Sequence, residues 1–222
     1  MKRILLWFFI SFLFGCEPPK IDNKIACVTL GNTKLLIPTK YFLPGFPPTL
    51  VPSKGLDKDV GELLEIPLRD LGYQKTGTGY ALDLTFLVTP LNVHHSQTGL
   101  PSMILEAWRG YGYYKDRIIE FDDMTQLYRV YTSEYRVSLE FFKSYPDGSM
   151  DYNDEWVAGC MVFSSEKKVK DLSNIVCDTI FLYKDVHIKM TFSGMYVDLI
   201  EEFKTKVRSV FKSWETETCE IN

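Results

Sequence analysis

The sequence predicts a single α+β domain: an antiparallel, strand-rich sheet with one long C-terminal helix packed on it. First, the middle of the chain contains several short segments in which apolar and polar residues alternate, as they do in strands. Second, apolar residues between Tyr196 and Trp214 recur every three or four positions, as on one side of a helix. Third, the strands precede the helix instead of alternating with helices, which is typical of α+β domains.

The amino-acid composition of the chain excludes several classes of protein. The 222 residues are 45% hydrophobic and 14% aromatic, which supports a sizeable core and excludes wholesale disorder. The formal charge is −4 and there is no basic block, so we expect no nucleic-acid partner. Only the extreme N-terminus is continuously apolar, which excludes a multi-span membrane protein.

The N-terminus has the pattern of a bacterial secretion signal. Two cations, Lys2 and Arg3, precede an apolar run that is too short to span a bilayer. The run ends in Leu13-Phe14-Gly15-Cys16, which is similar to the lipobox of bacterial lipoproteins. We therefore expect residues 1–15 to be a signal peptide and Cys16 to be the lipid-attachment residue; the alternative is an ordinary signal peptide with an incidental cysteine.

The rest of the chain then divides into a tether and a body. Residues 16–24 are polar and contain two prolines, so we expect a lipid-anchored tether, followed by a periplasmic α+β domain at 25–222. Glu17 follows the cysteine, where retention in the inner membrane usually requires aspartate. The resemblance to lipoproteins therefore implies the outer membrane, with the body facing the periplasm.

The predicted strands follow one another along the body. Residues 61–66 fit either a strand or a single helical turn, and residues 41–55, which contain four prolines, predict an irregular loop. His187 alternates with the apolar residues of its segment, which predicts that it faces solvent. In chain order the predicted strands are Ile25–Val28, Lys34–Ile37, Ala81–Val88, Met103–Arg109, Tyr128–Thr132, Tyr135–Phe142, Trp156–Phe163, Thr179–Tyr183 and Val186–Phe192.

Four cysteines remain once Cys16 is lipidated. An even number in an oxidising compartment predicts disulfides, and four cysteines allow three pairings. We favour Cys160–Cys177, because one lies in a predicted strand and the other just precedes the next, which leaves Cys27–Cys219. Four free thiols are the alternative.

The sequence contains no recognisable catalytic motif. It has no nucleophile elbow, no zinc-protease helix, no phosphate-binding loop and no dinucleotide glycine pattern. The neighbouring His94 and His95 point apart on an extended chain, and the acidic run 147–155 lacks the order of a calcium loop. We therefore expect no catalytic residue, no metal and no cofactor.

Acidic loops that carry aromatic residues are the candidate partner surface. Such loops suit a basic cleft on another protein, because opposite charge speeds association and aromatic side chains anchor interfaces. The candidate contact residues are Tyr113, Tyr114, Asp151, Tyr152, Asp154 and Trp156.

Three features together resemble lipoprotein immunity proteins of type VI secretion systems, nearest those that neutralise periplasmic phospholipase effectors. They are the lipobox, an early hairpin ending Leu36-Ile37-Pro38-Thr39-Lys40-Tyr41-Phe42, and a β-rich middle followed by a last unit of Cys177, strand, hairpin and helix ending Val210-Phe211-Lys212-Ser213-Trp214. The resemblance implies a non-enzymatic inhibitor that binds a lipase-like toxin, covering its active site or restraining its lid. Two alternatives are a structural or assembly lipoprotein of the envelope or secretion apparatus, and an enzyme with an unfamiliar site.

Overall fold

The computed structural model describes residues 25–43, 61–74, 83–91, 100–132, 138–149, 154–162, 172 and 175–219. The predicted signal peptide, Cys16 and the tether lie outside these residues, as do most of the proline-rich loop, His94 and His95. The described strands and α-helices are β1 (Ile25–Leu30), β2 (Thr33–Pro38), β3 (Glu62–Ile66), β4 (Leu84–Pro90), α1 (Leu100–Arg109), β5 (Ile118–Asp122), β6 (Leu127–Tyr131), β7 (Ser138–Phe142), β8 (Trp156–Val162), β9 (Ile175–Tyr183), β10 (Val186–Ser193) and α2 (Ile200–Trp214).

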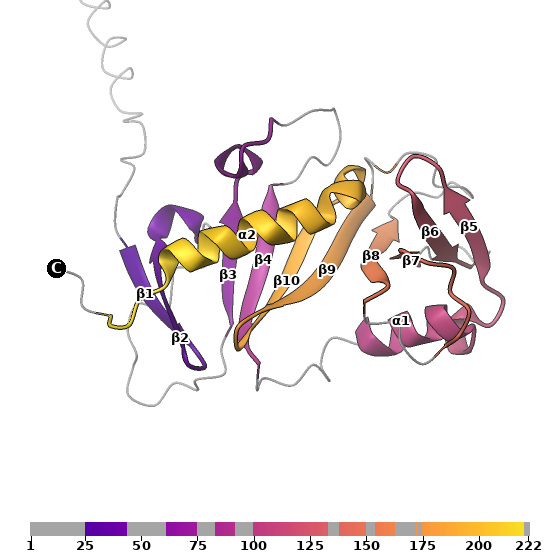
Figure 1. Cartoon of the computed structure of the whole chain (residues 1–222), viewed down its shortest axis with the longest axis horizontal. Helices are drawn as coiled ribbons and strands as arrows, with labels where there is room; N and C mark the ends of the chain where they lie inside the picture. Colours follow the sequence, from indigo (N-terminus) through magenta and orange to yellow (C-terminus); the bar gives the residue numbers. More distant parts are fainter. Residues whose placement is uncertain are drawn as a thin grey trace, which may run out of the picture.

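Eight of these strands form one antiparallel sheet in the order β3-β4-β10-β9-β8-β7-β6-β5. After β4 the chain crosses through α1 to the far edge of the sheet. It then returns strand by strand from β5 to β10, which pairs with β4. Consequently β3 and β5 are the two edges, and the long axis of the molecule runs between the β1–β2 hairpin and β5 (Figure 1).

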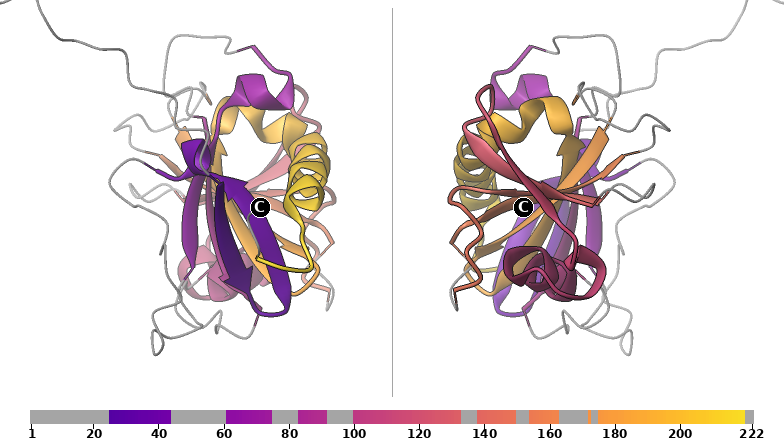
Figure 2. Two further views of the ribbon diagram at one scale, coloured as in Figure 1. Left: turned by 90° about the vertical axis from the view of Figure 1, so that its left-hand side faces the viewer. Right: turned by 90° about the vertical axis from the view of Figure 1, so that its right-hand side faces the viewer.

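The sheet buries apolar side chains in two cores, and β6, β7 and β8 contribute to both. The larger core joins one face of β3, β4, β10 and β9 to α2 and to the β1–β2 hairpin, with Phe203, Val207 and Phe211 of α2 fully buried. The smaller core joins α1 to β6, β7 and β8 around Trp108 and Phe142. In Figure 2, the views along the long axis show α2 lying beside the twisted sheet.

Strand β7 separates the two cores. Its residues from Leu139 to Phe142 are all buried. Because successive side chains of a strand point to opposite faces, Leu139 and Phe141 enter the larger core. Phe142 enters the smaller one, after an irregularity in the register between residues 141 and 142. We call the described residues between positions 100 and 162, which supply the smaller core, the α1 lobe.

The predicted C-terminal helix is confirmed: a 3-10 turn at Gly194–Leu199 leads directly into α2. The α+β class and the antiparallel sheet are also confirmed. Residues 62–66 form a strand, which decides between the two readings of that segment.

Two expectations about local structure were wrong. Met103–Arg109 lies in helix α1, because Ile104, Ala107 and Trp108 are buried at helical spacing. His187 is only 8% exposed, so it does not face solvent as its alternation suggested.

Both expected disulfides are bonded in the structure. Cys160 and Cys177 stand directly opposite each other in the β8–β9 register, with their Cα atoms 3.9 Å apart. The Cys27–Cys219 bond joins β1 to the segment after α2, across 192 residues of sequence. The β1–β2 hairpin is not part of the large sheet, so this bond is its covalent link to the C-terminal segment.

Candidate functional site: an aromatic patch at the β5 end of the sheet

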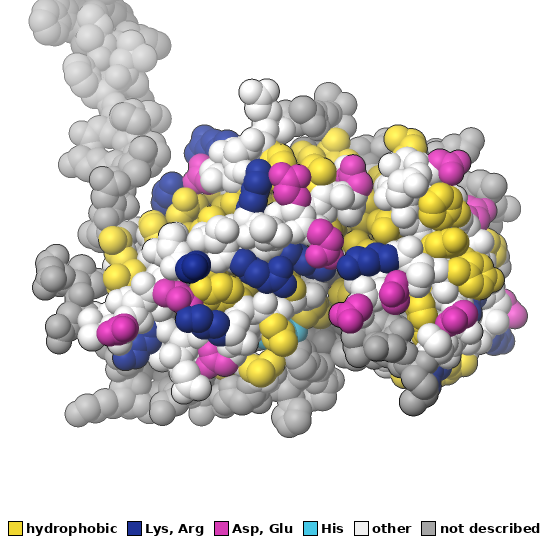
Figure 3. All heavy atoms as spheres, viewed as in Figure 1, with side chains coloured by type: hydrophobic (Ala, Val, Ile, Leu, Met, Phe, Trp, Pro, Cys, Tyr) yellow, Lys and Arg dark blue, Asp and Glu magenta, His cyan; other side chains and the backbone are white. Residues whose placement is uncertain are grey.

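The large hydrophobic side chains that stay exposed gather on the α1 lobe. Of the eleven among the described residues, six fall between positions 111 and 145. Figure 3 shows apolar surface over the β5 end of the molecule, with acidic side chains around it. The six are Tyr111, Tyr113, Ile118, Phe121, Met124 and Tyr145.

Three aromatic rings in this region form a continuous row. Phe121 of β5 lies opposite Tyr128 of β6 in the hairpin register, and their ring centroids are 5.0 Å apart. The ring of Tyr145 meets Tyr128 edge-on at 5.7 Å. Phe121 is 48% exposed and Tyr145 is 56% exposed, while Tyr128 is half-buried against the smaller core. We call these three residues the aromatic patch.

Two side-chain hydrogen bonds hold the loop that carries Tyr145 against the α1 lobe. The indole nitrogen of Trp108 donates a hydrogen bond of 2.8 Å to the backbone oxygen of Ser149. The guanidinium of Arg117 donates another of 2.8 Å to the backbone oxygen of Pro146. Because two side chains of the α1 lobe hold this loop, Tyr145 is already in place before any partner binds.

The β5–β6 turn that carries Met124 is fixed by Asp122. Its carboxylate accepts hydrogen bonds from the backbone N–H of Met124 at 3.1 Å and from the hydroxyl of Thr125 at 2.9 Å. It also pairs with Arg129 across the hairpin. The turn therefore presents the side chain of Met124, which is 89% exposed, on a constrained backbone.

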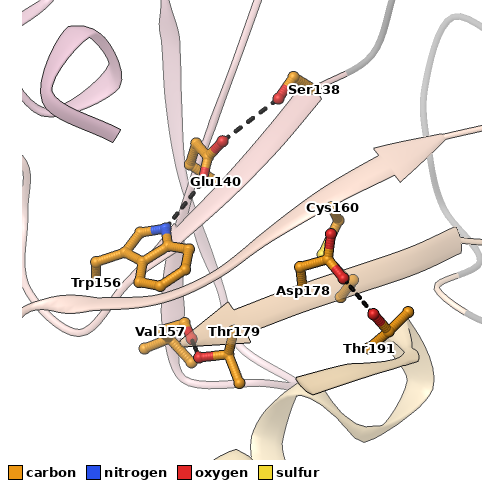
Figure 4. The surroundings of a disulfide bond; sticks show 9 residues. Ser138, Glu140, Trp156, Val157, Cys160, Asp178, Thr179 and Thr191 are labelled. Atoms are coloured by element: carbon orange, nitrogen blue, oxygen red, sulfur yellow. Dashed lines mark hydrogen bonds between the residues drawn. A yellow bond between two sulfur atoms is a disulfide. The ribbon is translucent and has the colours of Figure 1, made fainter. Parts of the chain in front are cut away.

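A buried carboxyl group lies inside the α1 lobe. Glu140 of β7 is 1% exposed and accepts a 2.8 Å hydrogen bond from the indole nitrogen of Trp156 (Figure 4). The hydroxyls of Tyr114 and Ser138 lie 3.4 Å from its other oxygen. Gly159 on β8 faces it, and a methyl group there would come within 2.7 Å of the carboxylate. Burial raises the pKa of Glu140 to about 7, although its hydrogen bonds favour the charged form.

Replacing Glu140 by Gln should remove a pH-dependent loss of stability. The proton binds more tightly in the folded state (pKa about 7) than in the unfolded state (ordinary value 4.5), so the stability that Glu140 supplies is complete below pH 4.5 and is lost as pH rises through 7. The loss amounts to about 3 kcal/mol by pH 8. Glu140→Gln, which stays neutral and still accepts from Trp156, should gain on the wild type by about 2.5 kcal/mol between pH 5 and pH 8, since part of the loss has already occurred at pH 5.

Urea unfolding at several pH values measures this difference. Asp154→Asn, at an exposed carboxylate of the same lobe, serves as the control and should follow the wild type throughout. A difference between Glu140→Gln and the wild type that does not change with pH would contradict the argument.

Of the six contact residues predicted from the sequence, two are exposed, two are buried and two lie outside the described residues. Tyr113 and Asp154 are exposed. Tyr114 and Trp156 are buried, because both point into the α1 lobe toward Glu140, so they do not offer surface to a partner. Asp151 and Tyr152 lie outside the described residues.

Sequence reasoning missed Phe121, Tyr128 and Tyr145 as a group. Phe121 lies in β5, a strand that was not expected, because most of its side chains are exposed and the apolar alternation is weak. The available signal was the turn-like run Asp122-Asp123-Met124-Thr125-Gln126 between two mostly apolar segments, Ile118–Phe121 and Leu127–Tyr131, which is typical of a hairpin.

The negative charge of the described residues is concentrated in the same lobe. The described residues of this lobe contain nine acidic and five basic side chains, a formal charge of −4. The other described residues, which are more numerous, contain eleven acidic and nine basic side chains, a formal charge of −2. The surroundings of the aromatic patch therefore favour a positively charged partner.

Within the described part of the chain, no three His, Cys, Asp or Glu side chains come together as metal ligands would. In the same part, no helix has the length and apolar character needed to cross a membrane.

Comparison with known proteins gives a similarity of fold. No family model matches the sequence, and no curated protein sequence matches it. A solved structure does: Smlt3025, an immunity protein of the Stenotrophomonas maltophilia type IV secretion system, superposes with a TM-score of 0.52 at 12% identity. The match covers 88% of this chain and 94% of that chain, so the two proteins share the fold over nearly their whole length.

Proposed function

We propose that this chain is an immunity protein of a bacterial secretion system, which binds a cognate toxin and blocks it without catalysing a reaction. The observation that carries the proposal is the aromatic patch: two exposed rings, Phe121 and Tyr145, which both pack against Tyr128 in an acidic lobe. The shared fold with Smlt3025, which is described as an immunity protein, supports the same kind of function.

The aromatic patch has the properties of a surface that could inhibit a toxin by binding it. Interfaces draw most of their energy from a few aromatic or arginine side chains that are buried by the partner. Rings that are already held in position lose little conformational entropy on binding. The negative charge of the α1 lobe would speed the approach of a basic toxin surface.

We further propose that the protein is anchored through lipid on Cys16 to the outer membrane, with its body in the periplasm, and that the toxin is a type VI phospholipase effector. The lipobox supports the anchor and the compartment, and two disulfides fit an oxidising compartment. The resemblance to immunity lipoproteins supports the toxin class. A phospholipase acts on membranes, so an inhibitor held at the membrane would meet it where it works.

Co-expression tests the function. A lipase-like toxin gene, sought next to the gene for this chain, is expressed with its product directed to the periplasm of a bacterial host, with and without the full chain. We expect growth to be restored only when the chain is present. Equal killing in both cultures would reject the immunity role, and recovery of the chain with structural secretion subunits instead would favour the assembly lipoprotein.

The anchor is tested by Cys16→Ser. This variant has no thiol to accept the diacylglyceryl group, so we expect it to lose palmitate labelling and to move from the membrane fraction to the soluble fraction. Glu17→Gln, which changes the next residue but keeps the thiol, should remain labelled and membrane-bound. Attachment of Cys16→Ser to membranes would contradict lipidation at this residue.

A further inference from the structure

The two edges of the sheet differ in how they are covered. Beyond β3, Phe42 forms a bridge with Leu64, and the backbone N–H of Leu43 donates to the oxygen of Leu63 at 3.4 Å. Beyond β5, no described segment pairs with the strand, whose neighbour in the sheet is β6 alone (Figure 1). The β5 edge is therefore open within the described part of the chain.

The side chains of β5 leave the backbone of this edge accessible, and two of them offer apolar surface to an added strand. Ile118 is 37% exposed on one face of the sheet and Phe121 is 48% exposed on the other. Monomeric proteins protect open edges with charged side chains, lysine above all, with proline or with a bulge, because unpaired backbone groups invite another strand. The β5 sequence, Ile-Ile-Glu-Phe-Asp, contains neither lysine nor proline and pairs with β6 without a register shift, so its edge protection is limited to the two carboxylates, which repel only a strand of like charge.

We propose that β5 is the strand to which an extended, basic segment of the toxin adds, as a ninth strand of the sheet. The proposal rests on the function proposed above. Main-chain hydrogen bonds along the edge would supply affinity, and alternate side chains of the added strand would supply specificity. On one face those side chains would contact Phe121, the outermost ring of the aromatic patch.

Charge selects this occupant over a second copy of the chain. Two β5 strands paired antiparallel about their centres would place Glu120 directly against Glu120, and like charges in that position are destabilising. Glu120 is exposed and is held by a hydrogen bond with Tyr131 of β6. A lysine or arginine of an added strand would instead face a positioned carboxylate within a lobe whose described residues have a formal charge of −4.

Hydrogen exchange on the purified full-length chain tests the proposal. The probe is a synthetic peptide of about ten residues that alternates lysine and valine, with a peptide that alternates glutamate and valine as its counterpart. We expect the lysine peptide to slow exchange of the β5 amides at low salt and to lose this effect at high salt. Protection at another edge, protection by the glutamate peptide or no protection of β5 would overturn the proposal. Protection that rises with protein concentration alone would identify a second copy as the occupant.

A charge variant separates the edge from general attraction. Glu120→Lys should weaken binding of the lysine peptide by about tenfold or more, because it faces the added strand with like charge. Asp198→Lys makes the same change in net charge at an exposed position outside the α1 lobe, and it should stay within about twofold of the wild type.

The co-expression assay keeps the two proposals apart. If the wild-type chain does not rescue cells from the toxin, the immunity function fails. If the wild type and Glu120→Lys rescue equally well, the function stands and strand addition at β5 is wrong.

Discussion

A variant with alanine at both Phe121 and Tyr145 should bind the toxin about a thousandfold more weakly than the wild type. Each ring is about half exposed in the free protein, so a partner that covers the aromatic patch would bury both. Removing a ring at the centre of an interface costs about 2 kcal/mol or more, which corresponds to roughly a thirtyfold loss per ring. Calorimetry with the toxin from the rescue assay measures the affinity, and the rescue itself should fail.

Leu182→Ala is the matched control. Leu182 is 49% exposed on β9, away from the α1 lobe, so its truncation removes similar apolar surface without touching the patch. Both the control and the double variant should unfold at the wild-type denaturant midpoint, because none of the three side chains is buried. Toxin binding by the double variant within about threefold of the wild type would show that the interface lies elsewhere.

The second large effect concerns stability. Replacing Cys27 and Cys219 by alanine should lower the free energy of unfolding by about 5 kcal/mol, because the bond closes a loop of 192 residues and the entropy it removes from the unfolded chain grows with loop length. A loss of this size is a large part of the stability of a typical domain. Denaturant unfolding of the oxidised proteins measures it.

The single variants supply the control for this loss. Cys27→Ala and Cys219→Ala each break the same bond, so each should be destabilised as much as the double variant. Cys27 is half-buried and Cys219 is exposed, so lost packing contributes little. A double variant that loses less than about 1 kcal/mol would contradict the loop-closure account.

The sequence predicted those parts of the fold whose pattern is local. The stripe that ends at Trp214 identified α2, and the Lys184-Asp185 turn identified the β9–β10 hairpin, with Lys184 in the left-handed region (φ 54°). Pairing between β4 and β10 joins segments about a hundred residues apart, so no local pattern specifies it. Met103–Arg109 was misread because a short apolar segment fits either period.

The candidate site was less predictable, because it depends on which face of the sheet is covered. Glu140 alternates with apolar residues, as an exposed side chain would, yet α1 covers that face and buries it. Tyr114 and Trp156 become interior side chains for the same reason. Phe121 and Tyr145 remain outside because β5 is the last strand, a position that only the complete strand order reveals.

The strand order has a consequence for how the protein would stand on a membrane. With lipid on Cys16, eight residues connect the bilayer to Ile25, and an extended chain of that length reaches at most about 30 Å. The β1–β2 hairpin must then stay close to the lipid headgroups. Strand β5 lies at the opposite end of the long axis (Figure 1). An anchored molecule that stands upright would therefore hold β5 and the aromatic patch away from the membrane. An arriving toxin could then be intercepted before it reaches the lipid.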